Sequence, residues 1–327
     1  MRSLNIQALA SALTNYYMQF QTGLHKEFEF GLLKGKHNLA DRFTVLTGIP
    51  DRLTLGSVTA DDFLHQHDPT DAQTFNPQDD VLNVTPREYV SRDFEGDLLF
   101  MDKDIERTWL MFQQGVANIE KMKAEEKMKR FVEYLFATIL NEKAMRTLRK
   151  AAIKATFSSA RPYAWNKILD GFETVIANEI VAGNITPVVL NVITPASVVV
   201  EVESVYDALS EEVQQADDLI IALKSSVFKA FVRANRKDLG RDFDYSKTNA
   251  VTIDGYPNAI IVNDPDAAYK VVAYRKSEAI LGVNFTEGGA PWEFQRADRT
   301  TKMMMNGKIG FEFQTVNKDR PNIAVGN

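Results

Sequence analysis

Apolar positions in the middle of the chain repeat at intervals of three and four residues, which is the spacing of one face of an α-helix. The repeat begins at Ile105 and resumes between Met128 and Leu148 after a charged stretch. Proline is absent from residues 87–161. We therefore predict a long helix from about 116 to 154, with a shorter helix before it. At about 1.5 Å per residue the long helix would span about 57 Å, which suits an elongated molecule.

Beyond residue 160 the pattern predicts one more helix and then an alternation of strands and helices. A helix over Tyr163–Ala182 should end at Gly183, because glycine favours the left-handed conformation at helix ends. The block that follows behaves as an α/β domain of its own. Its expected strands are Thr186–Ile193, Leu219–Leu223 and two runs of Val251–Val262 around Asp254-Gly255, and its expected helices are Ser225–Asn235 and one within Ser197–Gln215 behind a short extended run.

The last sixty residues predict strands again. Lys270–Tyr274 and Ala279–Val283 are two of them. Asn306-Gly307 should join two more, Thr300–Met305 and Lys308–Thr315, because this dipeptide favours tight hairpin turns. In the last of these strands Ile309, Phe311 and Phe313 alternate, as the residues of one buried face should.

The segment before the long helix, residues 41–104, is rich in turn residues and predicts a long two-stranded excursion followed by strands through Leu82–Val90. Leu53–Val58 is one of the short strand-like runs between the turns. Residues 1–40 are expected to form an N-terminal arm with a helix from Ser3 to Phe20.

Charge divides unevenly between these segments. Residues 41–104 carry fourteen Asp and Glu against five Lys and Arg, whereas 121–170 carry twelve Lys and Arg against five acids. Helical spacing puts the basic residues of the long helix on one face, with Arg149 beside them; we call this set the basic ridge: Lys143, Arg146, Arg149, Lys150 and Lys154. It could face solvent, a polyanion or the acidic segment of a second copy. The acids that would meet it form the acidic loop: Asp61, Asp62, Asp68, Asp71, Asp79 and Asp80.

The composition is that of a globular protein, and it excludes several kinds of chemistry. The chain has no cysteine, which removes disulfides, thiol nucleophiles and cysteine-bound metals. No phosphate-binding glycine motif occurs. The net charge of -6 argues against a surface that coats nucleic acid, and the longest apolar runs fall far short of the roughly 20 residues of a membrane span. We expect no cofactor and no membrane partner.

One cluster resembles half of a metal site. His65 and His67 flank one residue in an extended segment, and Asp68 follows them. The four histidines of the chain all precede residue 68, so no imidazole downstream could complete the site. The surrounding segment is polar and acidic, which favours a solvated loop. We therefore predict a protein that is not an enzyme and holds no metal, with a metal-dependent hydrolase using these three residues as the remote alternative.

The order of segments resembles one known family. The stretch DLIIALKSSVFKAFVRANRKDL, followed by TIDGYPNAIIVNDP and AYKVVAYRKSEAILGVNF, carries the resemblance best. Together with the arm, the acidic excursion and the long helix, it is similar to the major capsid proteins of tailed bacteriophages, which have the Hong Kong 97 shell fold. The resemblance implies an α+β fold with an N-terminal arm (1–42), an extended loop (43–82), a peripheral domain with a long spine helix (83–185), an inserted axial α/β domain (186–267) and return strands of the peripheral domain (268–327).

The resemblance also implies a function. Such proteins assemble into pentamers and hexamers of an icosahedral shell that encloses double-stranded DNA. Copies would meet at an axial tip: Arg236, Lys237, Asp238, Arg241 and Asp242. The extended loop has no lysine for an isopeptide bond, so we expect a shell without covalent cross-links. The same fold in an encapsulin-type nanocompartment is the alternative.

Several partners and a location follow from the same resemblance. The chief partner is the chain itself. Because the arm begins near Met1, a separate scaffolding protein is expected; a portal protein, a decoration protein and non-specific contact with packaged DNA complete the set. The expected location is the virion capsid, assembled in the host cytoplasm.

Overall fold

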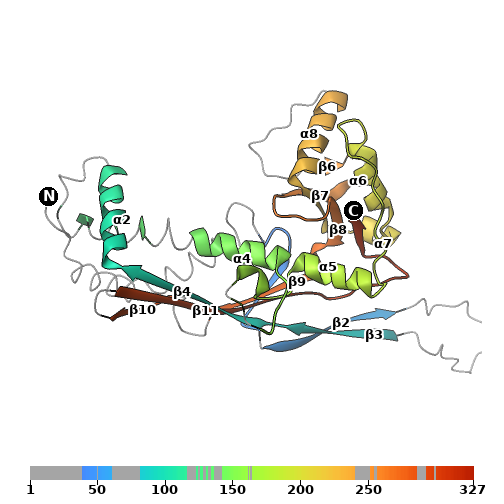
Figure 1. The fold of residues 1–327 in the computed structure, drawn as a ribbon. Helices are drawn as coiled ribbons and strands as arrows, with labels where there is room; N and C mark the ends of the chain where they lie inside the picture. Colours follow the sequence, from blue (N-terminus) through green and yellow to red (C-terminus); the bar gives the residue numbers. More distant parts are fainter. Residues whose placement is uncertain are drawn as a thin grey trace, which may run out of the picture.

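A computed structural model describes residues 39–49, 51–60, 82–115, 123, 126–127, 130–131, 134–135, 142–160, 162, 164–239, 251–253, 256–285, 292–297 and 300–327. They form a mixed α+β fold with two five-stranded sheets and a separate two-stranded sheet. Figure 1 shows an elongated molecule in which one sheet runs along the length and the other lies in a lobe above it. None of the described helices is long and apolar enough to cross a membrane.

The sheet along the length, here the body sheet, is built around one long strand, β11 (Thr300–Phe313). Strand β4 (Arg92–Met101) pairs antiparallel with it along one edge. On the other edge β10 (Trp292–Ala297) pairs with the first part of β11 and β9 (Ala279–Phe285) with the second, both antiparallel. Strand β1 (Thr44–Thr47) adds to β9 in parallel.

The hairpin expected at Asn306-Gly307 is wrong. Both residues lie inside β11, where Asn306 pairs with Glu95 and Gly307 with Phe94 of β4. A turn there would break the pairing of β11 with β4 and separate the two halves that hold β10 and β9. The local turn preference of the dipeptide is outweighed by these ladders. The expected buried face is confirmed, because Ile309, Phe311 and Phe313 are all buried.

The second sheet, here the lobe sheet, contains most of the expected α/β block. Its order is β12 (Ile323–Gly326), β8 (Val271–Arg275), β5 (Leu219–Lys224), β7 (Tyr256–Asp264) and β6 (Val251–Ile253). The central β5 is buried on both faces and runs parallel to β7. Helices α6 (Val198–Asp207) and α8 (Ser225–Leu239) pack together against one face, and the short α7 (Glu211–Gln214) follows α6. Residues 268–327 thus contribute strands to both sheets.

Two expectations in this block are wrong. Thr186–Ile193 is not a strand: only Val188 bridges to Gly326, and Val189 and Val192 are 90% and 83% exposed. Pro187 has no N–H to donate, and half of the side chains of the segment are exposed. Beyond the single bridge to β12, the segment pairs with no described strand. The short extended run before the helix is also absent, because α6 begins at Val198 and buries that residue.

The helix expected over Tyr163–Ala182 is interrupted. It consists of a short 3₁₀ turn, η3 (Trp165–Lys167), and α5 (Phe172–Val181). The chain between them pairs with the segment after α4: the Gly171 N–H donates to the Ala155 carbonyl at 2.7 Å. A Cβ at Gly171 would lie 2.7 Å from the Ala151 carbonyl oxygen, so this close approach requires glycine. The expected end of the helix is confirmed, because Gly183 has a φ of 78°.

The long helix is described only in part. Helix α2 (Asp102–Gly115) is the expected shorter helix, and α4 (Glu142–Lys154) is the end of the expected long one. Between them residues 126–127 and 130–131 are helical, and most of 116–141 lies outside the described residues. The N-terminal helix expected over 3–20 also lies outside them.

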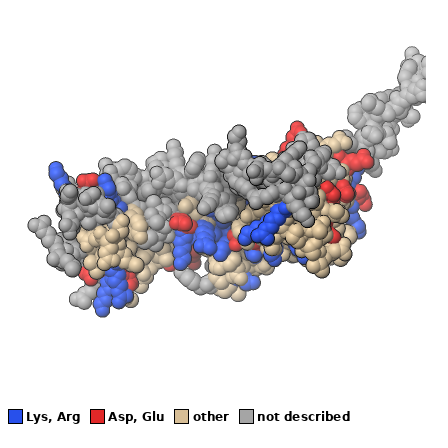
Figure 2. Space-filling view, turned by 90° about the horizontal axis from the view of Figure 1, so that it is seen from above, with Lys and Arg blue, Asp and Glu red and all other residues tan. Residues whose placement is uncertain are grey.

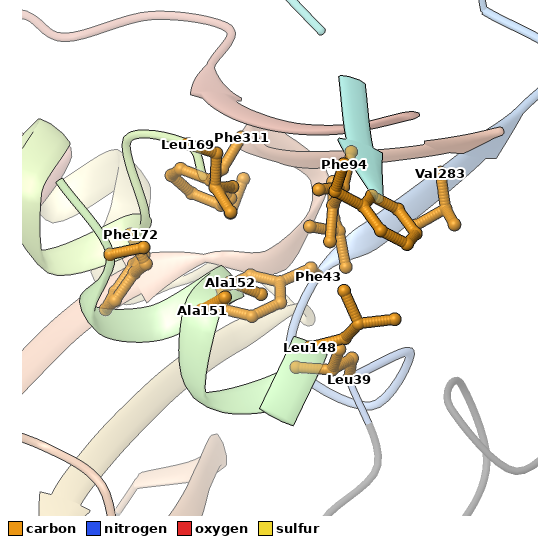
Figure 3. Close-up of a cluster of buried hydrophobic side chains, with 14 of the residues drawn as sticks. Leu39, Phe43, Phe94, Leu148, Ala151, Ala152, Leu169, Phe172, Val283 and Phe311 are labelled. Atoms are coloured by element: carbon orange, nitrogen blue, oxygen red, sulfur yellow. The ribbon is translucent and has the colours of Figure 1, made fainter. Parts of the chain in front are cut away.

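One continuous core joins the body sheet to the lobe sheet. Figure 3 shows Leu148, Ala151 and Ala152 of α4 beside Phe43 and other buried side chains of this cluster. Phe43 lies 5.2 Å from Phe311 of the body sheet and stacks at 6.2 Å on Tyr274 of the lobe sheet, measured between ring centroids. The face of the lobe sheet turned away from this core packs against α6 and α8 instead.

Two antiparallel strands, β2 (Arg52–Ala60) and β3 (Leu82–Val90), form a two-stranded excursion. Leu82–Val90, expected to follow the excursion, is thus one of its two strands. We call this pair the ribbon. Figure 1 shows it extending beyond the body sheet, beneath the lobe. Nine residues per strand correspond to about 30 Å. The ribbon is therefore a projecting element. Its position depends on the contacts at its root, the end of the ribbon that packs on the body sheet.

Candidate assembly surfaces

The ribbon is rooted on the body sheet by one aromatic ring. Tyr89 of β3 is fully buried and lies across Gly282 of β9 and Gly310 of β11, which face each other in the strand register. A Cβ at Gly282 would lie 2.0 Å from the Tyr89 hydroxyl, and one at Gly310 would lie 2.6 Å from it. The absence of side chains at the two glycines therefore makes room for this ring. Burial raises the pKa of Tyr89 above its usual range.

A half-buried ionic cluster holds the next part of the ribbon on the body. The Arg87 guanidinium donates to Glu179 of α5 at 2.6 Å and to Glu312 of β11 at 2.7 Å. Burial raises the pKa of Glu312. Burial acts in the same direction on Glu179, but the hydrogen bonds from Arg87 and Asn184 outweigh it and lower the pKa of Glu179. One side chain of the ribbon thereby joins the ribbon to α5 and to the body sheet at once.

A second buried pair joins the body to the lobe. The Nη1 of Arg42, two residues before β1, lies 2.7 Å from Oδ2 of Asp264 at the end of β7, and both side chains are only 4% exposed. Arg42 also donates to the Asn263 carbonyl. Burial and the negative charge of Asp264 raise the pKa of the neighbouring Glu173. The positive charge of the guanidinium thus compensates the buried Asp264 carboxylate, and the Asn263 carbonyl accepts a further hydrogen bond from it.

The basic ridge lies on α4. Lys143 and Arg146 are exposed, and Arg149, Lys150 and Lys154 are half-buried. Helical spacing places Lys143, Arg146, Lys150 and Lys154 opposite the buried Leu148 and Ala152, whereas Arg149 lies to one side. Burial lowers the pKa of Arg149. In Figure 2 Lys and Arg side chains gather near the middle of the molecule, where α4 lies.

The structure does not bring the basic ridge together with the other expected sites. The acidic loop lies wholly outside the described residues, as do His65 and His67, so neither the charge pairing nor the metal half-site is placed. In the axial tip the backbone of Arg236, Lys237 and Asp238 belongs to α8, while Arg241 and Asp242 lie outside the described residues.

Sequence reasoning missed the root of the ribbon and the Arg42–Asp264 pair. Gly282 and Gly310 each interrupt a strand-like run, and a glycine inside a strand often marks a close approach of another group. That signal was available, but nothing in the sequence identifies Tyr89 as its partner. The ion pairs join residues more than 90 positions apart, and charge alone does not select such partners.

No family model matches the chain, and no curated protein matches its sequence. Solved structures do match its fold. A chain of the satellite phage P4 procapsid, solved with its size determination protein, aligns over 92% of this chain and 98% of its own with a TM-score of 0.53 and 8% identity. The capsid of Myoviridae phage XM1 aligns over 88% and 91% (TM-score 0.51, 10% identity). A structure of Gordonia phage Cozz aligns over 88% and 85% (TM-score 0.51, 11% identity). The chain therefore has the fold of the tailed-phage major capsid proteins.

Proposed function

We propose that this chain is a structural major capsid protein of the Hong Kong 97 type, not an enzyme. Its copies assemble into pentamers and hexamers of an icosahedral shell around double-stranded DNA, without covalent cross-links. The observation that carries this proposal is the ribbon, rooted by Tyr89 and Arg87, on a fold otherwise seen in phage capsids. A two-stranded ribbon is at best marginally stable alone in water, so the surface of a neighbouring copy is its natural support.

The expected domains map onto this fold as part of the proposal. The body sheet with α4 and α5 corresponds to the peripheral domain with its spine helix, and the ribbon to the extended loop continued through β3. The lobe corresponds to the axial domain, joined by β8 and β12 from the expected return strands. The acidic loop at the end of the ribbon would then rest on the basic ridge of a neighbour. A separate scaffolding protein, a portal protein, a decoration protein and the packaged DNA are the further partners of a shell assembled in the host cytoplasm.

An encapsulin-type nanocompartment is the second candidate for the same fold. The solved structures described above belong to phages, and two of them are named as a capsid or a procapsid, which favours the phage shell. The nature of the enclosed material separates the two candidates, because a phage shell encloses DNA and a nanocompartment encloses protein.

Electron microscopy of the purified chain, with light scattering, tests the proposal. We expect closed shells or rings of five and six copies, both for the wild type and for His65→Ala/His67→Ala. A structural protein does not depend on these two imidazoles, whereas a hydrolase would lose its metal with them. A small species that holds stoichiometric metal and loses it in the double variant would contradict the shell.

Reversing the charge of the basic ridge should impair assembly. With Lys143→Glu, Arg146→Glu and Lys150→Glu, each contact with the acidic loop should weaken by about tenfold, since an exposed ion pair contributes about 0.2–1 kcal/mol. Circular dichroism should show unchanged helix content, because these residues lie opposite the buried face of α4. Raising the salt concentration to about 1 M, where the Debye length is about 3 Å, should weaken wild-type assembly in the same direction. Normal particle yields from the triple variant would remove the pairing.

A further inference from the structure

The lobe separates its charges along the sequence. Residues 186–223 contain seven Asp and Glu and no Lys or Arg, whereas residues 224–237 contain five Lys and Arg and no acid. Such a division gives one part of the lobe a negative field and the adjoining part a positive field. The question is where the fold places the two parts.

The fold places them at opposite edges of the lobe sheet. Helix α6 lies over β12 and β8 at one edge, and α8 lies over β5 and β7 toward the other. The segment after Pro187 runs along β12, where the Val188 N–H donates to the Val325 carbonyl at 2.8 Å. Figure 1 shows α6 and α7 on one side of the lobe and α8 with β6 on the other, and in Figure 2 Asp and Glu gather at the end where α6 and α7 lie.

The first edge combines exposed acids with exposed valines. Val189, Val192 and Val200 are 90%, 83% and 64% exposed, and Asp207, Glu211 and Glu212 are exposed beside them along the chain; these six residues are the acidic edge. The loop that carries Val189 and Val192 is held against α6, because the side-chain amide of Asn191 donates to Glu201 at 2.8 Å and its backbone N–H donates to the same carboxylate at 3.0 Å. Fixed, exposed apolar side chains with a charged rim are typical of an interaction surface.

The second edge presents cations. Lys229 and Arg233 of α8 are exposed and form the basic edge. Lys229 and Arg233 are four residues apart on α8, so they share a face, while Val227 and Phe231 are buried against the sheet. Within the part of the chain that the structure describes, no ion pair involves any charged residue of either edge.

We propose that the acidic edge of one copy docks on the basic edge of the next copy. The proposal rests on the proposed function, because it names the contact by which copies would join into a ring. Two different patches on opposite sides of one lobe make a head-to-tail contact, and such contacts close into rings when the rotation between copies fits. A polyanion on the basic edge would leave the acidic edge and its valines without a role, whereas a second copy accounts for both edges. Burial, and in second place the negative charge of Asp207, raises the pKa of Glu203, and cations from a second copy would offset that charge.

Two charge reversals that complement each other test this contact. Lys229→Glu/Arg233→Glu makes both edges acidic, and Asp207→Lys/Glu211→Lys makes both edges basic. Each variant alone should associate at least about tenfold more weakly than the wild type in sedimentation over a range of protein concentrations. An equimolar mixture should recover wild-type affinity, because copies that alternate around a ring again pair acid with base. The recovered rings should contain even numbers of copies, and Glu106→Lys on the distant α2 is the matched control.

The outcomes separate this inference from the proposed function. If the wild type associates but the variants associate equally well, the proposed contact is wrong while shell assembly stands. The same holds if the mixture of variants does not recover wild-type affinity. If Lys229→Glu/Arg233→Glu keeps self-association but loses binding to a 30-base-pair DNA duplex, the basic edge serves a polyanion and the inference is wrong. A wild type that stays monomeric at all concentrations, with and without a crowding agent, contradicts shell assembly itself.

Discussion

Replacing Arg42 with methionine should lower the free energy of unfolding by about 3–5 kcal/mol. Methionine keeps much of the packing of the side chain but removes the charge. The Asp264 carboxylate, 2.7 Å away and 4% exposed, would then stay buried without a cation. Glu173, whose pKa is already raised by burial and by Asp264, would lie beside an uncompensated carboxylate. Breaking a buried pair from one side is costly because the remaining charge cannot reach water.

Urea denaturation followed by circular dichroism measures this change. Arg52→Met is the matched control, because Arg52 pairs with Glu88 at 3.1 Å with side chains 75% and 57% exposed. That exposed pair should contribute no more than about 1 kcal/mol. The double variant Arg42→Met/Asp264→Leu should recover most of the lost stability, since apolar residues of similar volume can replace a buried pair. Equal decreases in the free energy of unfolding for Arg42→Met and Arg52→Met would show that the buried pair stabilises the fold no more than the exposed pair does.

The pair also matters for the shape of the subunit. Arg42 lies two residues before β1 of the body sheet, and Asp264 ends β7 of the lobe sheet. The apolar core across the same junction, where Phe43 stacks on Tyr274, constrains the orientation by close packing. The ion pair adds a polar contact of fixed geometry to this junction, so both contribute to how the lobe lies on the body. In a shell, that orientation decides whether the edges of neighbouring lobes can meet.

The periodicity of the sequence predicted correctly those helices and strands whose own hydrophobic pattern is sufficient to define them. The helix α8 and the strand β5 have complete hydrophobic patterns, and the ribbon strands are flanked by turn residues. The pattern failed where distant segments decide. Asn306-Gly307 is kept extended by its pairing with β4. The sequence did not indicate β4, because Leu98, Leu99 and Met101 do not alternate with polar residues as a half-buried strand should, and the structure leaves all three exposed.

The candidate site divides in the same way. The basic ridge followed from helical spacing, since four of its residues share one face of α4. The ribbon root depends on the register of β9 and β11, which places Gly282 opposite Gly310. A register is a property of two paired strands, so one sequence does not reveal it. For the same reason Arg87 could be recognised as a cation but not as the link between Glu179 and Glu312.

Gly282→Ala should lower the free energy of unfolding by about 1–3 kcal/mol and reduce the yield of particles more than stability alone would explain. The new methyl group would lie 2.0 Å from the Tyr89 hydroxyl and 2.7 Å from Cδ1 of Ile49, so the buried ring must move. Because the ring belongs to β3, its displacement tilts the whole ribbon. A small shift at the root becomes a larger one about 30 Å away, where a neighbour would have to receive the tip.

A double-variant cycle with Tyr89→Ala isolates this clash. Tyr89→Ala alone should cost about 3–5 kcal/mol. In that background the extra cost of Gly282→Ala should fall to the small cost of moving Cδ1 of Ile49, because the methyl group no longer meets a ring. Gly96→Ala in the same sheet is the control: its Cβ would meet only the Cβ of Met305, at an ordinary 3.7 Å. That change should be neutral or stabilise by up to about 1 kcal/mol through the unfolded chain. Additive costs for Gly282→Ala and Tyr89→Ala would mean that the absence of a side chain at Gly282 does not serve the ring, and the direction of the ribbon would then depend on its other contacts with the body sheet, such as those of Arg87.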